Sequence, residues 1–495
     1  MEKDTFFGFP GAQASSGGGP RAAPRPSPSG GQKPATTLHT TPTPNVKRPA
    51  PLKEEAAGAS PRGEGREAGA GAGAGGAARG RMAGAARAAG PGFSACFDSG
   101  NGILGSNTPG GSGGAAHTLR VAISDDPFTE VDGRAHKMWF HFKVSNLQGC
   151  GGPVRVVLTN AGDCSYPAGW EGVGAEGYKC VFSTDRQNWQ RLQATEYADG
   201  ELAMTLDASA GGQLAGADAV WLAYFAPYSQ ERYMDLMGGL VASCPRAATA
   251  TIGRTLDGAD MEMVTVRGGP DTNTDKLSLW FIARQHPGES MASWWMEGFL
   301  RRLLDPADPV STALLALADI RVVPMMNPDG ARRGYLRTNA AGANLNREWA
   351  GPTEDYSPEV FHVLREMRLA GLDFCLDVHG DEALPYNFVA GGEGCPVWSP
   401  RLEGLQQDWS DAYQRASPDF QQVHGYEKEE PGKANLRVCS NALLQAFDAL
   451  VMTLEMPFKD NANSPDPALG WSPARCDRLG AAALDATLHV AHRLR

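Results

Sequence analysis

Between residues 250 and 495, short apolar runs alternate with longer stretches in which apolar residues recur every three or four positions. A short apolar run predicts a buried strand, whereas the longer spacing predicts an amphipathic helix. Alternation of these two patterns is typical of an α/β fold. The strand-like runs are Leu277–Ala283, Asp319–Met326, Phe374–Val378 and Leu450–Leu454, and the helix-like stretch Ser290–Leu304 follows the first of them.

Polar residues follow each of these runs. His286 and Glu289 come after the first run, the turn-like sequence Asn327–Gly330 after the second, His379 after the third and Glu455 after the fourth. Open α/β sheets bind their ligands at the carboxyl ends of their strands. A His and a Glu three residues apart are a weak signal alone, but four such placements together predict a functional site.

The residue types at these positions suit zinc. A catalytic zinc site takes three protein ligands and keeps one position open, and His286, Glu289 and His379 supply a suitable set. Bound zinc lowers the pKa of its water to about 7, and Glu455 is placed to take that proton as general base. A strand end facing solvent is the alternative for Glu455, but both of its neighbours are apolar, where an acid is costly.

Two loops between the second and third runs carry arginines. In Gly334–Asn339, Arg337 is a candidate to stabilise the oxyanion that forms when a carbonyl is attacked. In Gly342–Trp349, Asn346 and Arg347 are candidates to hold a terminal carboxylate, because the guanidinium fork matches its geometry. The alternative is that Arg337 and Arg347 are ordinary surface residues. Their position in loops beside the predicted metal favours a functional role.

Residues 93–246 have a different sequence pattern. Short runs rich in aromatic and β-branched residues are separated by turns, which predicts an all-β sandwich. His141 is interpreted as a hydrogen-bonded histidine rather than a ligand. The Tyr166–Trp170 loop is interpreted as a turn held by aromatic packing, with ligand binding as the alternative. We assign no chemistry to this part. Its strand-like runs are Leu119–Ile123, Met138–Val144, Val154–Leu158 and Ala219–Phe225.

Residues 1–92 are dominated by Gly, Ala, Pro, Ser and Arg. Few large apolar side chains are available to offset the entropy cost of ordering, so we predict a disordered low-complexity segment. An organelle transit peptide is the alternative, but the acids Glu2 and Asp4 argue against it. A start at Met82 is a further alternative. The predicted domains are therefore 1–92, 93–246 and 247–495.

Charge and cysteine content narrow the function classes. Residues 1–92 contain 12 Lys and Arg against 6 Asp and Glu, which gives them a charge of about +6. Because the whole chain carries −11, residues 93–495 carry about −17. An acidic folded part argues against nucleic-acid binding. The nine dispersed cysteines are typical of reduced thiols in an intracellular protein. No apolar run approaches the roughly 20 residues that span a bilayer, so we expect no membrane partner and a cytoplasmic location.

These motifs in this order resemble the zinc metallocarboxypeptidases. His-x-x-Glu, Asn-Pro-Asp-Gly, an arginine, Asn-Arg, a distant histidine and Thr-Leu-Glu follow one another along the chain. The first folded half looks like the amino-terminal domain of cytosolic carboxypeptidases, a subfamily with tubulin-deglutamylating and bacterial members. Its motifs are Phe97–Asn101, Trp139–Phe142, Tyr166–Trp170 and Tyr224–Ser229. The resemblance covers about residues 93–470.

The resemblance implies an α/β carboxypeptidase-like domain with a mixed central sheet behind a β-sandwich. It implies one zinc ion, with His286, Glu289 and His379 as ligands and Glu455 as general base. By the same resemblance Arg337 polarises the scissile carbonyl, while Asn346 and Arg347 clamp the substrate carboxylate. The implied partner is a peptide or protein C-terminus, with tubulin as a candidate.

One region departs from the family pattern. The family often carries a mobile tyrosine upstream of the general base, but the nearest tyrosine here is Tyr426, and we do not assign it that role. Lys433 and Arg437 lie in this region and are candidates to line the side-chain pocket. A basic pocket would suit a terminal Glu or Asp, and solvated surface charges are the alternative.

The sequence therefore predicts a zinc metallocarboxypeptidase that removes C-terminal residues, Glu among the candidates, from peptides or proteins. Two alternatives stay open: a zinc amide hydrolase that acts on small N-acyl amino acids, and a non-catalytic binding protein that keeps the fold. The complete set of ligands and base argues against the second.

Overall fold

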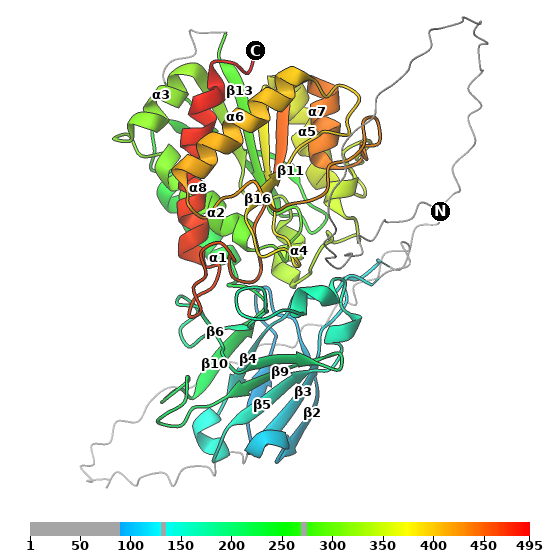
Figure 1. Cartoon of the computed structure of the whole chain (residues 1–495), viewed down its shortest axis with the longest axis vertical. Coiled ribbons are helices and arrows are strands. Elements are labelled where there is room, and N and C mark those ends of the chain that lie inside the picture. The colour runs from blue at the N-terminus through cyan, green and yellow to red at the C-terminus, as the bar shows by residue number, and fades with distance from the viewer. Residues whose placement is uncertain (1–89, 130–134, 269–274) are drawn as a thin grey trace, which may run out of the picture. The chain divides into compact units, whose positions relative to one another are not determined.

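The structure is a computed structural model that describes residues 90–129, 135–268 and 275–495 (Figure 1). The segment 1–92 was predicted to be disordered, and that prediction falls outside the described residues except for positions 90–92. The described chain contains a β-rich part followed by an α/β part (Figure 1).

The β-rich part is a sandwich of two five-stranded sheets, which confirms the predicted fold class. One sheet has the strand order β1-β4-β10-β6-β7 and the other β2-β3-β5-β9-β8. All neighbours are antiparallel except β3 and β5, which are parallel. The strands are β1 (Gly92–Ser94), β2 (Ile103–Pro109), β3 (His117–Ala122), β4 (His141–Ser145), β5 (Val154–Leu158), β6 (Val181–Ser183), β7 (Gln190–Arg191), β8 (Thr195–Ala198), β9 (Glu201–Leu206) and β10 (Ala219–Ala223).

The sandwich core follows from the alternation of side chains along its strands. Leu119 and Val121 of β3 are buried, while Arg120 between them is exposed. Val154 and Val156 of β5 are buried in the same way. Because successive side chains in a strand point to opposite faces, one face of the sheet is apolar and packs on the other sheet.

The run Met138–Val144 is strand-like in sequence, but β4 begins only at His141. Trp139 is buried before the strand, and its Nε1 donates to Ser99 O at 2.8 Å. His141 Nδ1 lies 3.0 Å from Ser99 Oγ. Burial, with a contribution from Arg186, lowers the pKa of His141 to about 3, so its imidazole is neutral. These contacts fit the interpretation of His141 as a hydrogen-bonded residue.

The α/β part is built on a seven-stranded sheet with the order β11-β12-β14-β13-β15-β17-β16. β13 is parallel to β14 and β15, and β15 is parallel to β17, whereas the other pairs are antiparallel, so the sheet is mixed as predicted. Its strands are β11 (Ala247–Arg254), β12 (Asp260–Val266), β13 (Leu277–Ala283), β14 (Ala318–Val323), β15 (Phe374–Val378), β16 (Phe388–Ala390) and β17 (Leu450–Glu455).

The central strands lie where the apolar runs predicted them. β13 and β15 coincide with the runs 277–283 and 374–378, and every residue of β13, β15 and β17 is buried. Parallel strands covered on both faces by helices read as continuous apolar runs, because neither face meets water.

Helices cover this sheet. α2, α3 and α6 pack against α8; in Figure 1, α2, α3 and α8 lie to the left of β13, while α5 and α7 lie to its right. The helices are α1 (Gln230–Asp235), α2 (Met291–Leu303), α3 (Pro309–Leu317), α4 (Pro328–Arg333), α5 (Pro358–Ala370), α6 (Pro400–Ala416), α7 (Cys439–Phe447) and α8 (Pro473–Ala491).

The Asn327–Gly330 sequence was expected to form a turn, and it instead starts helix α4. Asn327 caps the helix, since its Oδ1 accepts from Gly330 N at 2.9 Å. Pro328 suits the first helical position because its missing N–H would be unsatisfied there. The helix ends at Gly334, whose positive φ of 71° favours glycine.

The sandwich and the α/β part belong to one compact unit. Tyr224 of the sandwich stacks on Phe458 with ring centroids 4.3 Å apart. Arg191 Nη1 lies 3.4 Å from Asp460 Oδ2 in a buried ion pair. We propose a domain boundary at residues 246/247, because β11, the first strand of the second sheet, begins at Ala247.

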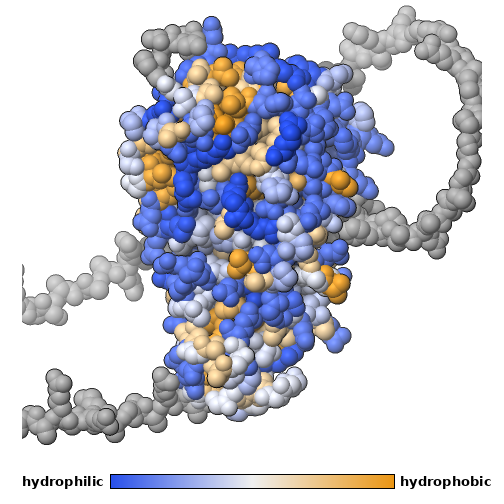
Figure 2. Space-filling model, turned by 60° about the vertical axis from the view of Figure 1, so that its left-hand side comes forward, coloured by the Kyte–Doolittle hydropathy of each residue, from blue (hydrophilic) through white to orange (hydrophobic). Residues whose placement is uncertain are grey.

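The surface is polar over most of the face drawn in Figure 2, and its hydrophobic residues form small separate groups. Within the described ranges, every helix is too short or too polar to cross a membrane. All nine cysteines are free thiols.

Candidate metal and catalytic site

The loop that follows β13 is held by its own buried arginine. Arg284 has a φ of 66°, in the left-handed region that L residues rarely adopt. Its guanidinium donates from Nε to Pro287 O at 2.7 Å and from Nη1 to Ser293 Oγ at 2.9 Å. These bonds tie the loop to the first turn of α2. The sharp turn at Arg284 thereby directs the next residues toward the carboxyl end of the sheet.

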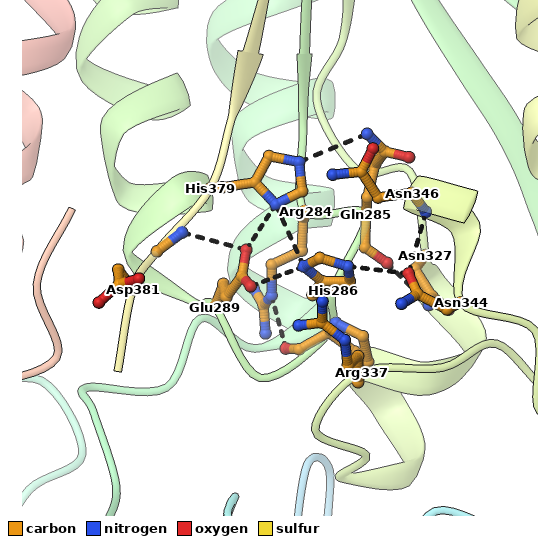
Figure 3. A network of polar contacts seen from close by, with 12 residues as sticks. Arg284, Gln285, His286, Glu289, Asn327, Arg337, Asn344, Asn346, His379 and Asp381 are labelled. Carbon is orange, nitrogen blue, oxygen red and sulfur yellow. Dashed lines mark hydrogen bonds and ion pairs between the residues drawn. The ribbon is translucent and has the colours of Figure 1, made fainter. Parts of the chain in front are cut away.

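Three side chains converge there, as Figure 3 shows. His286 Nδ1 lies 2.7 Å from Glu289 Oε1, and Glu289 Oε2 lies 2.9 Å from His379 Nδ1. The two Nδ1 atoms are 3.2 Å apart. All three side chains are buried, at 4, 2 and 1% exposure. Among the described residues they form the one His, Cys, Asp or Glu group arranged to hold a metal ion.

The opposite nitrogen of each imidazole is engaged by a neighbour. His379 Nε2 lies 2.9 Å from Asp377 Oδ2, and His286 Nε2 lies 3.0 Å from Asn344 Oδ1. Asn344 Oδ1 also accepts from Asn346 N, which fixes the oxygen on that side. An acceptor opposite Nε2 selects the tautomer with its proton there, so both Nδ1 lone pairs point into the cluster.

The donor set fits zinc. Two imidazole nitrogens and one carboxylate are ligands that zinc prefers in catalytic sites. Burial and the charge of Arg337 lower the pKa of His286 to about 4, so it stays in the neutral form that binds metal. Burial would raise the pKa of Glu289, but His286 and His379 outweigh it and hold that pKa low, so the carboxylate is ionised.

Glu455 is the last residue of β17 and lies beside His379. His379 N donates to Leu454 O at 2.8 Å, which places the two strand ends in register. Glu455 is 7% exposed, and its Oε2 is buried without a hydrogen-bond partner in the described parts of the chain. Burial and nearby carboxylates, Glu289 foremost, raise its pKa, and a divalent cation beside it would oppose that shift. An unpaired buried carboxylate oxygen is suited to accept a proton from a bound water.

Arg337 lies between the α/β part and the sandwich. It is half-buried, and its guanidinium is 5.6 Å from the centroid of the Tyr166 ring. Burial would lower the pKa of Arg337, but Tyr166, Glu382 and Glu289 raise it, so it remains a cation. Figure 3 shows Arg337 below His286. A cation beside the predicted metal ligands can stabilise negative charge on a substrate carbonyl.

Asn346 and Arg347 follow Asn344 in a short 3-10 helix, Leu345–Arg347. Asn346 Oδ1 accepts from Cys439 N at 2.8 Å, so its Nδ2 is the end that can donate to a ligand. Arg347 is half-buried, and its Nη1 donates to Asn346 O at 2.8 Å. The backbone N of Asn346 donates to Asn344 Oδ1, which also contacts His286 Nε2, so this short helix is tied to a predicted metal ligand.

Lys433 and Arg437 are placed differently from the other predicted site residues. Lys433 is exposed. Arg437 is also exposed, and it donates from Nε to Arg347 O at 2.9 Å and from Nη2 to Glu348 Oε1 at 3.2 Å. Arg437 thus supports the loop that carries Arg347. Their role in a side-chain pocket stays a prediction.

Tyr426 lies close to the site. Its hydroxyl donates to Asp381 Oδ2 at 2.7 Å, and its ring packs edge-on against Phe388 with centroids 4.9 Å apart. Tyr426 is 49% exposed, but desolvation at its hydroxyl, with Asp381 and Glu455, raises its pKa, so the hydroxyl keeps its proton. It is a donor held beside the predicted general base.

Several residues around the metal ligands were not singled out from the sequence. Gln285 Nε2 donates to Asp377 Oδ2 at 2.6 Å, and Trp349 Nε1 donates to Gln285 Oε1 at 2.9 Å. For Asp377 the sequence holds a signal, since it is the one acid in the apolar run Phe374–Val378. Asn344 and Gln285 have no comparable signal because polar loop residues are common.

Comparison with known proteins agrees with this geometry. Residues 93–225 match the family described as cytosolic carboxypeptidase N-terminal domain, and residues 233–379 match the family described as zinc carboxypeptidase. The chain belongs to the zinc carboxypeptidase family, with a cytosolic carboxypeptidase N-terminal domain before the peptidase part. It is a zinc metallocarboxypeptidase, a hydrolase of peptide bonds.

Solved structures are similar over almost their whole length. A metallo-carboxypeptidase from Pseudomonas aeruginosa, solved with (2-guanidinoethylmercapto)succinic acid, is 39% identical with a TM-score of 0.73, and the match covers 81% of this chain and 100% of that one. A metallo-carboxypeptidase from Burkholderia cenocepacia is 38% identical with a TM-score of 0.73, covering 81% and 99%.

A human relative is more distant. Cytosolic carboxypeptidase 4 is 28% identical over 306 residues, which is 53% of this chain and 26% of the human protein. The chain thus spans about a quarter of that relative, whose remaining length has no counterpart in the match.

Proposed function

We propose that this protein removes residues one at a time from the C-terminus of peptides or proteins, with one zinc ion held by His286, Glu289 and His379. The observation that carries the proposal is the convergence of two Nδ1 atoms and a carboxylate beside Glu455, whose Oε2 has no partner within the described ranges. A metal site alone would fit many hydrolases. The unpaired carboxylate next to it favours hydrolysis by an activated water.

The proposed roles follow from position. Zinc, when bound, supplies a Lewis acid that acidifies water and polarises a carbonyl. Glu455 takes a proton from the attacking water at Oε2 and returns it to the leaving amine. Arg337 stabilises the charge that develops on the carbonyl oxygen. Asn346 Nδ2 and the Arg347 guanidinium bind the terminal carboxylate, which selects for the end of a chain.

The finer proposal is a preference for a terminal Glu, with tubulin as a candidate protein substrate. The resemblance to tubulin-deglutamylating enzymes supports it. The local charges are mixed, because Asp381 and Glu382 lie near Glu455 while Arg437 is engaged by Glu348. A cation for an acidic side chain would therefore come from Arg347 or Lys433. We also propose a cytoplasmic location, in keeping with the names of the cytosolic relatives.

Digestion of a peptide library tests these proposals. Zinc-loaded protein is incubated with peptides that differ only in the terminal residue, with polyglutamate chains and with N-acyl amino acids, and the products are weighed by mass spectrometry. Glu455→Gln, prepared and zinc-loaded in the same way, is the control. Stepwise loss from the C-terminus by the wild type alone is expected. Cleavage of N-acyl amino acids but not peptides would favour the small-substrate hydrolase instead.

A further inference from the structure

One acid of the sandwich holds the loop that carries Arg337. Asp126 Oδ1 accepts from Leu336 N at 2.7 Å. Asp126 Oδ2 accepts from Arg337 N at 2.8 Å, Thr338 N at 3.0 Å and Thr338 Oγ1 at 3.1 Å. Three consecutive backbone N–H groups of the peptidase part thus converge on one carboxylate that lies 210 residues earlier in the chain.

This arrangement constrains the loop strongly. Asp126 is 2% exposed, and charge-assisted bonds of this kind are about twice as strong as neutral ones. Burial raises the pKa of Asp126 to about 6, although its bonds to Arg337, Leu336 and Thr338 oppose the shift. The group is therefore still ionised at neutral pH. A buried carboxylate is costly unless hydrogen bonds satisfy it, and the bonds to residues 336–338 do so while they hold the loop.

The same loop segment contacts the metal-ligand loop. Leu336 O accepts from Gly288 N at 2.8 Å, and Gly288 lies between His286 and Glu289. A Cβ on Gly288 would meet Leu336 O at 2.9 Å, so the two backbones are as close as glycine allows. A displacement of residues 336–338 would therefore move Arg337 and would also disturb the loop that carries His286 and Glu289.

The other end of Arg337 also meets the sandwich. Its guanidinium lies 5.6 Å from the centroid of the Tyr166 ring. Burial, with Glu382 and Glu289, raises the pKa of Tyr166 to about 12, so the ring is neutral and its face attracts a cation. The sandwich therefore contacts Arg337 at two points. Asp126 accepts from its backbone N–H, and the Tyr166 ring packs against its guanidinium.

We propose that Asp126 is a positioning residue for the peptidase reaction, which acts by holding the 336–338 backbone so that Arg337 faces the substrate carbonyl. The sandwich, to which the sequence assigned no chemistry, thereby completes the active site. This inference rests on the proposed function, because it needs Arg337 to act in turnover.

The alternative is that Asp126 only joins the two parts of the unit. Asn101 offers a matched control for that role. It also belongs to the sandwich and is buried, and its Nδ2 donates to Gly334 O at 3.0 Å, three residues before Arg337. Asn101→Ala removes this buried contact and the two bonds of Asn101 to Ser124, but none of the bonds between Asp126 and residues 336–338.

The test uses the full-length zinc-loaded chain and a peptide that the wild type cleaves in the library. Asp126→Asn is expected to lower kcat roughly 10- to 100-fold with KM within about threefold, because the loss falls on a transition-state interaction. In an Arg337→Gln background, the further loss from Asp126→Asn should be under about threefold, since both act through one group. Asn101→Ala should keep kcat within about threefold even if its melting temperature falls.

A second variant and a hydrogen-exchange measurement distinguish a displaced 336–338 loop from general misfolding of Asp126→Asn. Thr338→Val removes only the Thr338 Oγ1 bond and should lower kcat by about two- to fivefold. Amide hydrogen exchange by mass spectrometry should be faster at residues 336–338 in Asp126→Asn and unchanged in strands β3 and β5. Zinc content should stay at one ion per chain.

The outcomes separate the inference from the proposed function. Unchanged exchange at 336–338, unchanged kcat in Asp126→Asn, or a full additional loss in the Arg337→Gln background would overturn the inference while the wild type still cleaves peptides. A wild type that cleaves no peptide would overturn the proposed function and the inference with it.

Discussion

His379 Nε2 lies 2.9 Å from Oδ2 of Asp377, two residues earlier on the same strand end. This contact keeps the proton of His379 on Nε2 and its Nδ1 lone pair toward His286 and Glu289. Gln285 holds the same Asp377 oxygen at 2.6 Å, so the carboxylate cannot rotate freely. Asp377 and Gln285 thus fix the orientation of His379, a predicted metal ligand.

We expect Asp377→Asn to weaken zinc binding by about 10- to 100-fold, because the amide holds His379 less firmly and makes it a poorer donor. Competition with a chromophoric chelator measures the affinity. Asp319→Asn is the matched control, since Asp319 lies on β14 of the same sheet, with β13 between it and β15, and pairs with Arg267. Equal affinities for wild type and Asp377→Asn would refute the orienting role.

Glu455→Gln should abolish turnover and keep the zinc. The amide cannot accept the proton, and loss of a general base lowers kcat by roughly 10²- to 10⁴-fold. Zinc content by mass spectrometry and kcat with a library peptide are measured on the same sample. Near-normal turnover in a zinc-loaded sample would remove Glu455 from the mechanism.

Zinc removal should lower both activity and stability. A chelator should abolish cleavage, and added zinc should restore it, because the ligand cluster is the one arranged for metal in the described chain. Zinc at 100 times its dissociation constant stabilises the folded state by about 2.7 kcal/mol, so the melting temperature should rise on reloading. His286→Ala should show no such zinc-dependent rise; if it does, the ion binds elsewhere.

Arg437→Ala should affect substrates with every terminal residue alike. Arg437 supports Arg347 through its carbonyl, so its loss should raise KM about 2- to 10-fold whatever the terminal side chain. Lys428→Ala serves as a control for removal of one exposed positive charge, since Lys428 is exposed and pairs with Glu393. If Arg437→Ala lost activity only on peptides that end in Glu, Arg437 would instead line the side-chain pocket.

Glu359 predicts a pH dependence of stability that is separate from catalysis. Burial, opposed by its bond to Asn339 and aided by Asp329 and Asp257, raises its pKa to about 7 from 4.5. Between about pH 4.5 and 7, the Glu359 carboxyl is therefore protonated in the folded state and ionised in the unfolded state. Its contribution to stability is full below about pH 4.5 and is lost as the pH rises through about 7.

We therefore expect Glu359→Gln to be more stable than wild type at pH 8, by on the order of 3 kcal/mol, and nearly equal at pH 4.5. Urea unfolding at the two pH values measures the difference. Glu403→Gln, at an exposed position on α6, is the control for the loss of one carboxylate. A Glu359→Gln effect that is the same at both pH values would contradict the assigned cause.

Local pattern was sufficient for much of the fold and for selecting the residues that the structure brings together at the candidate metal site. β13 and β15 coincide with their apolar runs because a strand buried on both faces has no polar position to interrupt it. His286, Glu289, His379 and Glu455 stand at strand ends, and parallel neighbours bring such ends to one edge. Helix α4 was missed, since Asn-Pro-Asp-Gly suits a turn and an N-cap equally.

The sequence alone therefore determined the strands, the order of the motifs and the residue types at the metal site, because these depend on burial and on neighbours in the chain. Only the tertiary structure decided what surrounds them. Asp126 and Tyr166 of the sandwich contact Arg337, and Arg437 Nε donates to Arg347 O. Such contacts depend on how two separately patterned parts pack, and side-chain periodicity carries no information about that packing.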